Sequence, residues 1–117
     1  MAESDPIDRA VFGSLLDSLG GDREFLGELL EVYFEDAPRL QEKMHAALAA
    51  GSADEFRRAA HSLKSTSANF GAMTLSRMCK ELEDLGKGGA LDGAAEGLAL
   101  AEAEYGRVRA ELDATAG

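Results

Sequence analysis

The sequence predicts an all-α protein: an antiparallel up-down four-helix bundle with an additional N-terminal helix packed across one end. Three observations lead to this fold class. Ala, Leu and Glu are abundant in the composition while β-branched residues are scarce, which favours helix. Apolar residues recur every three or four positions, and the alternation typical of strands never persists. The connections between these periodic segments are short, so neighbouring helices should pack antiparallel.

The first predicted helix covers about residues 6–19 and would lie across one end of the bundle as a lid. Asp5 is a suitable N-cap, and Pro6 suits the first helical position because its missing N–H is not needed there. Gly20 and Gly21 should end this helix, since glycine readily adopts the left-handed conformation of a helix terminus.

The four bundle helices are expected between about residues 22 and 114. Asp22 is a suitable N-cap for the first of them, and Ser52-Ala-Asp-Glu55 has the pattern of a capping box at the start of the second. Pro38 lies inside an otherwise helical pattern, so it should kink that helix or divide it near Asp36. The four ranges are about 22–50, 52–70, 74–85 and 92–114.

Length, charge and cysteine content narrow the class of protein. A chain of 117 residues favours one domain, and an acidic single bundle is most simply a monomer. The formal net charge is −10, so the surface should repel nucleic acid. The apolar runs are too short to cross a bilayer. Cys79 is the only cysteine, which excludes an internal disulfide and fits a cytoplasmic location.

The third predicted segment carries His61 at its centre, in the stretch HSLKSTSANFGA. A helix advances about 100° per residue, which places Phe70 about 180° from His61. His61 should therefore point away from the core. The residues expected on the buried side with Phe70 are Phe56, Ala59, Leu63 and Thr66. The residues expected around the exposed imidazole are Arg57, Arg58, Lys64, Ser65 and Ala68, with Asn69 slightly further round.

An exposed histidine can have one of several roles. It can be an ordinary surface residue. A zinc site needs three or four ligands, and His61 has no second His or Glu at the i+4 position, so no metal is expected. Ser65 at i+4 suggests a Ser-His dyad, but the pattern offers no acid to orient the imidazole and no oxyanion donors. Residues 57–64, RRAAHSLK, carry three cations and no anion, which favours handling of an anionic group.

AHSLKSTSANFGA resembles the signature of histidine phosphotransfer (HPt) domains of two-component phosphorelays. That pattern has His, any residue, Leu, Lys, a small residue, Ser or Thr, and later Gly-Ala. The similarity extends to Phe34-Glu-Asp-Ala-Pro38 and Cys79-Lys-Glu-Leu-Glu83 and covers about residues 7–108. Many family members have Gly where this chain has Ser65, a departure that bears on partner choice and on the lifetime of the phosphohistidine. The resemblance implies a single HPt domain over residues 1–117.

The resemblance also implies a function. His61 would accept a phosphoryl group and exchange it with the aspartate of response-regulator receiver domains, with a hybrid sensor histidine kinase as the second class of partner. Lys64 would neutralise phosphoryl charge, and Arg57 and Arg58 would assist or contact the partner. Ser65 and Asn69 are either phosphoryl-adjacent donors or simply solvated. Ala68 is either an ordinary helix former or a source of clearance for the partner.

The chain is therefore expected to be a phosphoryl carrier rather than an autonomous enzyme. It has no nucleotide-binding motif, so it should not phosphorylate itself from ATP, and it needs no cofactor, with Mg²⁺ expected on the receiver. Docking should extend from His61 onto the neighbouring helix. Phe12 and Leu16 either anchor the receiver or pack the lid onto the bundle. The alternatives are a helical adaptor that carries no phosphate and, less favoured, a hydrolase or metalloenzyme.

Overall fold

A computed structural model of the chain describes residues 5–116, so the outermost residues of the predicted domain, 1–4 and 117, lie outside it. The described part is all-helical and contains five helices. No helix within it is long and apolar enough to span a membrane. The helices are α1 (Arg9–Ser18), α2 (Arg23–Ala50), α3 (Ala53–Asn69), α4 (Met73–Lys87) and α5 (Ala94–Ala116).

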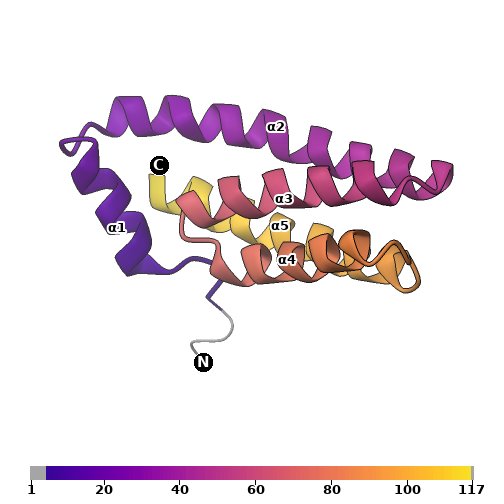
Figure 1. Cartoon of the computed structure of the whole chain (residues 1–117). Helices are drawn as coiled ribbons and strands as arrows, with labels where there is room; N and C mark the ends of the chain where they lie inside the picture. The colour runs from indigo at the N-terminus through magenta and orange to yellow at the C-terminus, as the bar shows by residue number, and fades with distance from the viewer. Residues whose placement is uncertain (1–4, 117) are drawn as a thin grey trace.

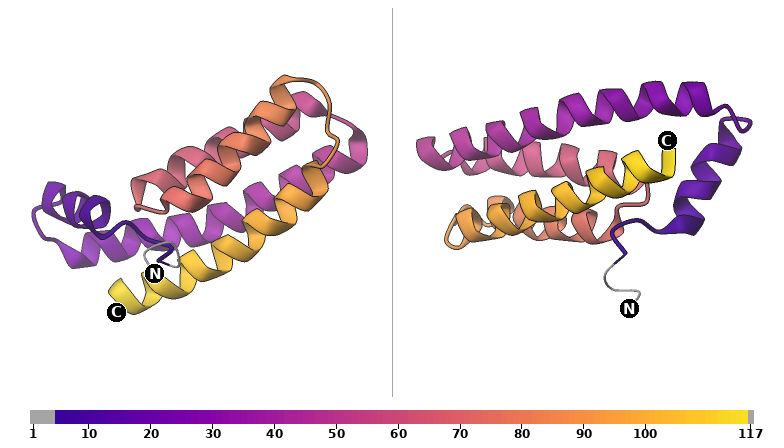
Figure 2. Two further views of the ribbon diagram at one scale, coloured as in Figure 1. Left: turned by 90° about the horizontal axis from the view of Figure 1, so that it is seen from below. Right: turned by 180° about the vertical axis from the view of Figure 1, so that it is seen from behind.

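Helices α2 to α5 form a closed four-helix bundle. Each packs against its chain neighbour, and α2 also packs against α5, which closes the ring. Figure 1 shows the long helices running in alternating directions, with α1 set crosswise at the end where α2 begins. The two views in Figure 2 agree on this placement of α1. The predicted fold class is confirmed.

Capping residues fix where the bundle helices begin. Asp22 caps α2 by accepting a hydrogen bond from the Phe25 N–H at 3.0 Å. Ser52 caps α3 through the Glu55 N–H at 3.3 Å, as the capping-box pattern predicts. Between these helices Gly51 adopts φ +69°, the left-handed conformation in which glycine carries no steric cost.

The first helix begins later than its sequence pattern indicates. Asp8, not Asp5, is the N-cap of α1, and it accepts hydrogen bonds from the N–H groups of Ala10 and Val11. The carboxylate of Asp5 instead accepts from the Ile7 N–H at 3.1 Å, which holds residues 5–8 in a turn before the helix. This turn allows Ile7 to bury its side chain almost completely, at 1% exposure.

The lid helix packs onto the bundle through the residues proposed as docking anchors. Phe12 is buried and Leu16 is half-buried against the core, so the packing interpretation of these residues holds. Phe12 is not an exposed anchor for a partner.

Pro38 does not divide α2, which runs without interruption from Arg23 to Ala50. Proline removes one N–H from the helical ladder, the one that would bond to the carbonyl of Phe34. The pyrrolidine ring is exposed, and the helix packs on both sides of it against α3 and α5. This packing outweighs the loss of a single backbone hydrogen bond.

The buried face of α3 is turned slightly from the face that the apolar pattern indicates. Ser67 is fully buried, whereas Thr66 is only half-buried and hydrogen-bonds to the backbone carbonyls of its own helix. The Ser67 hydroxyl lies 2.8 Å from the Tyr33 hydroxyl of α2, so both buried polar groups are satisfied. The other residues buried on this face are Phe56, Ala59, Ala60, Leu63 and Phe70.

Replacing Gly71 with Ala should destabilise the fold by about 2 to 4 kcal/mol. Gly71 has φ +84°, and an added Cβ would lie 2.8 Å from the Asp8 carbonyl oxygen. That approach is needed because the Asp8 N–H donates to the Gly71 carbonyl at 2.7 Å. Urea denaturation measures the loss in the free energy of unfolding.

Gly51→Ala is the matched control for this prediction. Gly51 also has positive φ, but an added Cβ would meet nothing within 4 Å. The control should lose only about 1 kcal/mol, the cost of the left-handed conformation. Equal losses in the two variants would contradict the close contact between the lid segment and the α3–α4 turn.

Candidate functional site

His61 lies in the middle of α3 with its side chain 55% exposed, as the helical pattern indicates. The opposite face of the helix is anchored in the core by Phe56, Ala60 and Leu63, each fully buried. This anchoring fixes the backbone of His61, so the ring stands on a rigid element that another macromolecule can reach.

An acid does orient this imidazole, and the expectation that none is present was wrong. The Glu83 side chain of α4 is only 5% exposed, and its Oε2 lies 2.9 Å from His61 Nδ1. Its Oε1 accepts a hydrogen bond from Lys64 Nζ at 2.7 Å. A further cation, Lys87, has its Nζ 4.0 Å from Oε2. One buried carboxylate thus holds the ring of His61 and the ammonium of Lys64 together.

The surroundings of Glu83 keep it ionised. The hydrogen bond from Lys64 is the largest cause of a pKa lowered to about 2; burial opposes this shift, and the bond to His61 adds to it. An ionised carboxylate can only accept hydrogen bonds. Nδ1 of His61 must therefore carry the proton, which leaves the lone pair of a neutral ring on Nε2.

The sequence contains a signal for Glu83, because it follows Leu75 by eight positions and Cys79 by four. Both of these residues are fully buried on α4. A charged residue at such spacing lies beside the buried stripe and requires a partner. Which partner it meets depends on how α4 is placed against α3, and that cannot be read from either helix alone.

Lys64 is held at the α3–α4 contact rather than standing free in solvent. Its side chain is 24% exposed, and its ammonium is bonded to Glu83. Its backbone carbonyl also accepts a hydrogen bond from the Ser76 hydroxyl of α4 at 3.1 Å. These bonds tie the helix that carries His61 to the helix that carries Glu83.

The two arginines do not give the site the cationic field that the segment RRAAHSLK indicates. Arg57 and Arg58 both pair with Asp54, one turn earlier on α3, at 2.7 and 3.1 Å. The hydrogen bond from Arg57 is the main cause of a lowered pKa at Asp54, and Arg58 contributes. With Glu83 beside Lys64, the three cations of residues 57–64 therefore face two anions.

The three small or polar residues proposed near the ring differ in placement. Ser65 and Asn69 are exposed, and Ala68 is half-buried. Neither Ser65 nor Asn69 makes a hydrogen bond to His61 in the described part of the chain, so their assignment as phosphoryl-adjacent donors stays a prediction. Among residues 5–116, no group of three or more His, Cys, Asp or Glu side chains is arranged to hold a metal.

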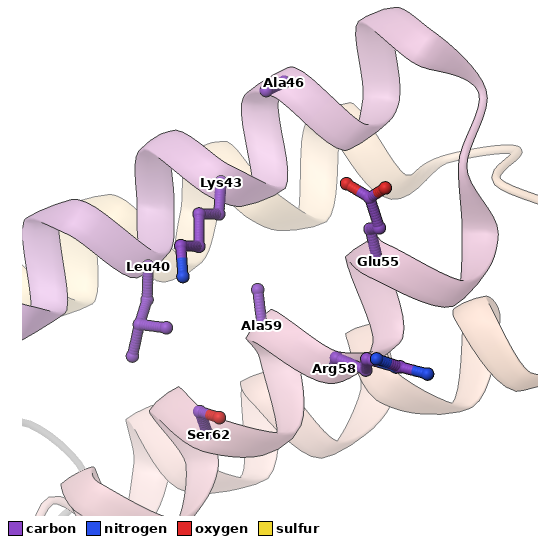
Figure 3. Close-up of a pocket in the computed structure, with 7 residues that line it drawn as sticks. All are labelled: Leu40, Lys43, Ala46, Glu55, Arg58, Ala59 and Ser62. Carbon is purple, nitrogen blue, oxygen red and sulfur yellow. The ribbon is translucent and has the colours of Figure 1, made fainter.

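Two hollows lie in the groove between α2 and α3. The larger, about 310 Å³, has a partly apolar lining, with Leu40 from α2 and Ala59 from α3; Lys43, Arg58 and Ser62 contribute its polar groups (Figure 3). Lys43 has no ion-pair partner among the described residues. The smaller hollow, about 210 Å³, is lined by Leu29, Val32, Tyr33, Asp36, Thr66, Asn69 and Phe70.

The Glu83 carboxyl should make the free energy of unfolding depend on pH, because its pKa is lower in the folded protein than the ordinary 4.5. A depressed carboxyl pKa contributes stability above the unfolded value, and this stability is lost as pH falls through the folded value. The free energy of unfolding of the wild type should exceed that of Glu83→Gln at pH 7, and the difference should shrink as pH falls from 4.5 toward about 2. Urea denaturation at pH 7, 4.5 and 3 measures it. A difference that is constant over these pH values would contradict the ionised Lys64–Glu83–His61 arrangement.

Comparison with known proteins places the chain in a family. The family model described as Hpt domain matches residues 28–116 of this chain. The chain belongs to the Hpt domain family. The crystal structure of histidine-containing phosphotransfer protein B (HptB) from Pseudomonas aeruginosa PAO1 superposes with a TM-score of 0.87 at 32% sequence identity, over 95% of this chain and 94% of that one. A comparison with curated protein sequences found no match.

A second solved structure supports the same fold. Histidine-containing phosphotransfer protein ZmHP2 from maize gives a TM-score of 0.81 at 24% identity, over 97% of this chain and 90% of that one. The predicted family and its phosphotransfer function are confirmed: this Hpt protein is a phosphocarrier of a two-component phosphorelay.

Proposed function

We propose that Nε2 of His61 is the atom that carries the phosphoryl group. The observation that carries this proposal is the 2.9 Å contact between His61 Nδ1 and Glu83 Oε2. Because the ionised carboxylate holds the proton on Nδ1, the nucleophilic lone pair of the neutral ring lies on Nε2. The donor is the aspartyl phosphate of a response-regulator receiver domain, and the transfer is reversible.

The chemical step needs little from this chain beyond alignment and charge. Nε2 attacks the phosphorus, a P–N bond forms, and the P–O bond to the aspartate breaks, which returns that residue to a carboxylate. No proton moves, since Nδ1 keeps its hydrogen. The ring becomes positively charged as the bond forms, and the Glu83 carboxylate beside Nδ1 stabilises this charge. Glu83 is a positioning residue, because it acts through the ring and not on the phosphoryl group.

The receiver docks over the His61 face and the groove between α2 and α3. The apolar residues Leu40, Ala59 and Val32 border the two hollows, and the unpaired ammonium of Lys43 suits the acidic rim of a receiver. Ser65 is exposed on the same face. Compared with the Gly of many family members, it places only one additional hydroxymethyl group in the path of the receiver. The interface is expected to be small and transient.

We also propose an oligomeric state, a location and an upstream partner for the protein. The protein is a monomeric cytoplasmic carrier without affinity for nucleic acid, and a hybrid sensor histidine kinase is the upstream source of its phosphate. It requires no cofactor of its own, and Mg²⁺ binds to the receiver. It does not use ATP directly, because a lone imidazole without a nucleotide site has no means to bind and activate the triphosphate.

The experiment is transfer from a receiver domain labelled on its aspartate with radioactive phosphate. Label should move to this chain when the two proteins are mixed with Mg²⁺, and it should be lost in acid and retained in base, as a phosphoramidate is. Label that survives acid would identify a phosphoester on a hydroxyl such as that of Ser65. That outcome, or no transfer from any receiver of the source organism, would refute the proposal.

A further inference from the structure

The cations around Glu83 differ in how firmly they are held. Lys64 is largely buried and donates to Oε1 at 2.7 Å, so its ammonium is already committed to a charged hydrogen bond. Moving it to a phosphoryl group would leave a buried carboxylate without its main partner, which is costly. Lys64 is therefore poorly suited to leave Glu83 when phosphate arrives.

Lys87 is held much more loosely at the same carboxylate. Its side chain is 57% exposed, and its ammonium lies 4.0 Å from Oε2, beyond hydrogen-bond distance. The same oxygen lies 2.9 Å from His61 Nδ1, so the Lys87 ammonium and the His61 ring share Oε2 of Glu83 as a neighbour. The ammonium can swing from Oε2 toward a group on the imidazole without breaking a hydrogen bond.

The backbone of Lys87 is nevertheless well fixed. It is the last residue of α4, and the Gly88 N–H closes the helix by donating to the Asp84 carbonyl at 3.1 Å. Gly86 packs so closely on α3 that an added Cβ would lie 2.8 Å from the Cβ of Arg57, one helical turn before His61. The end of α4 thus packs closely against α3 near His61, while the exposed side chain of Lys87 is free to move.

The other cations near this seam are paired more tightly. Lys80 of α4 lies 3.4 Å from Asp84, and Arg57 and Arg58 share Asp54 at 2.7 and 3.1 Å. Each would have to give up its own partner to reach the ring. Lys87, by contrast, has only the 4.0 Å ion pair with Glu83 Oε2 to give up.

We propose that Lys87 is the cation that binds the phosphoryl group on His61, while Lys64 stays with Glu83 and holds the imidazole in place. The proposal rests on His61 as the phosphoryl carrier. A phosphoryl group with nearly two negative charges attracts a mobile ammonium more strongly than a carboxylate that is already bonded to Lys64 and to the His61 ring. Lys64 thus positions the His61 ring, and Lys87 neutralises the negative charge of the phosphoryl group on that ring.

The test uses the isolated chain phosphorylated on histidine with phosphoramidate, so that contacts with a receiver do not contribute to the measured titration. Titration of the ³¹P chemical shift reports the second pKa of the phosphoryl group, which a neighbouring cation lowers. Lys87→Ala should raise this pKa by about half a pH unit at low ionic strength. Lys87→Arg should restore most of the effect, and 1 M salt should abolish the difference between wild type and Lys87→Ala.

Two control variants separate the roles of the lysines. Lys80→Ala removes an exposed lysine from the same helix and should leave the ³¹P titration unchanged. Lys64→Ala should lower the free energy of unfolding but change the phosphoryl pKa less than Lys87→Ala does. If Lys64→Ala raises that pKa and Lys87→Ala behaves like Lys80→Ala, the division of roles is wrong. Failure of His61 to take up phosphate would refute the proposed function itself, a result distinguishable from an unshifted titration.

Discussion

Replacing His61 with Gln is expected to abolish phosphoryl uptake and leave the bundle folded. Glutamine has no nucleophilic nitrogen, yet its side chain fits a position that is 55% exposed and its amide can still donate to Glu83. The loss of label should be complete, beyond about a hundredfold, because no nucleophilic nitrogen remains at this position. Transfer of label from a phosphorylated receiver measures it, with circular dichroism and urea denaturation to establish that the fold is kept.

The second histidine provides the matched control. His45 of α2 is 56% exposed and pairs with Glu102 of α5 at 2.9 Å, so it resembles His61 in exposure and in having a carboxylate partner. His45→Gln should take up label at the wild-type rate. Equal labelling of His61→Gln and the wild type would remove His61 from the mechanism. Specific receiver binding without any labelling of the wild type would point to a helical adaptor.

Removal of the Glu83 carboxylate should have the second largest effect. In Glu83→Ala the Nδ1 proton is no longer fixed, the charge that stabilises the phosphorylated ring is gone, and Lys64 loses its partner. A charge-assisted hydrogen bond is worth about 1.5 to 3 kcal/mol, so transfer should slow by about tenfold to a hundredfold. Glu83→Gln keeps an acceptor for Nδ1 without the charge and should fall between the wild type and Glu83→Ala.

The rate of label transfer from a saturating phosphorylated receiver measures this effect. Glu81→Ala is the matched control, since Glu81 is an exposed acid on the same helix without an ion-pair partner in the described chain. It should transfer at the wild-type rate. If Glu83→Ala does so too, the carboxylate only stabilises the fold and does not assist the chemistry.

The bundle and the exposed histidine could be predicted because both follow from local pattern. Apolar residues at helical spacing define one face per helix, and the caps at Asp22 and Ser52 mark where two of the helices begin. His61 lies opposite the apolar face of its own helix, so its exposure required no knowledge of other helices. The start of α1 could not be placed as well, because both Asp5 and Asp8 can cap and the burial of Ile7 decides between them.

The electrostatics of the site could be predicted only in part. Asp54 lies three and four residues before the two arginines, so their pairing follows from helical spacing, although the charge balance of residues 57–64 alone does not include it. Glu83 is different, because its contact with His61 depends on how α4 is placed against α3. Gly86 and the Ser76–Lys64 hydrogen bond help to fix that placement, and neither is visible in the pattern of one helix.

¹⁵N NMR of the His61 ring before and after phosphorylation identifies which nitrogen carries the proton and which carries the phosphoryl group. In the free protein, at a pH where the ring is uncharged, the proton should lie on Nδ1. Coupling between ³¹P and Nε2 should be seen once the phosphoryl group is attached. A proton on Nε2 in the free protein, or a phosphoryl group on Nδ1, would contradict phosphoryl transfer through Nε2 with Glu83 holding Nδ1.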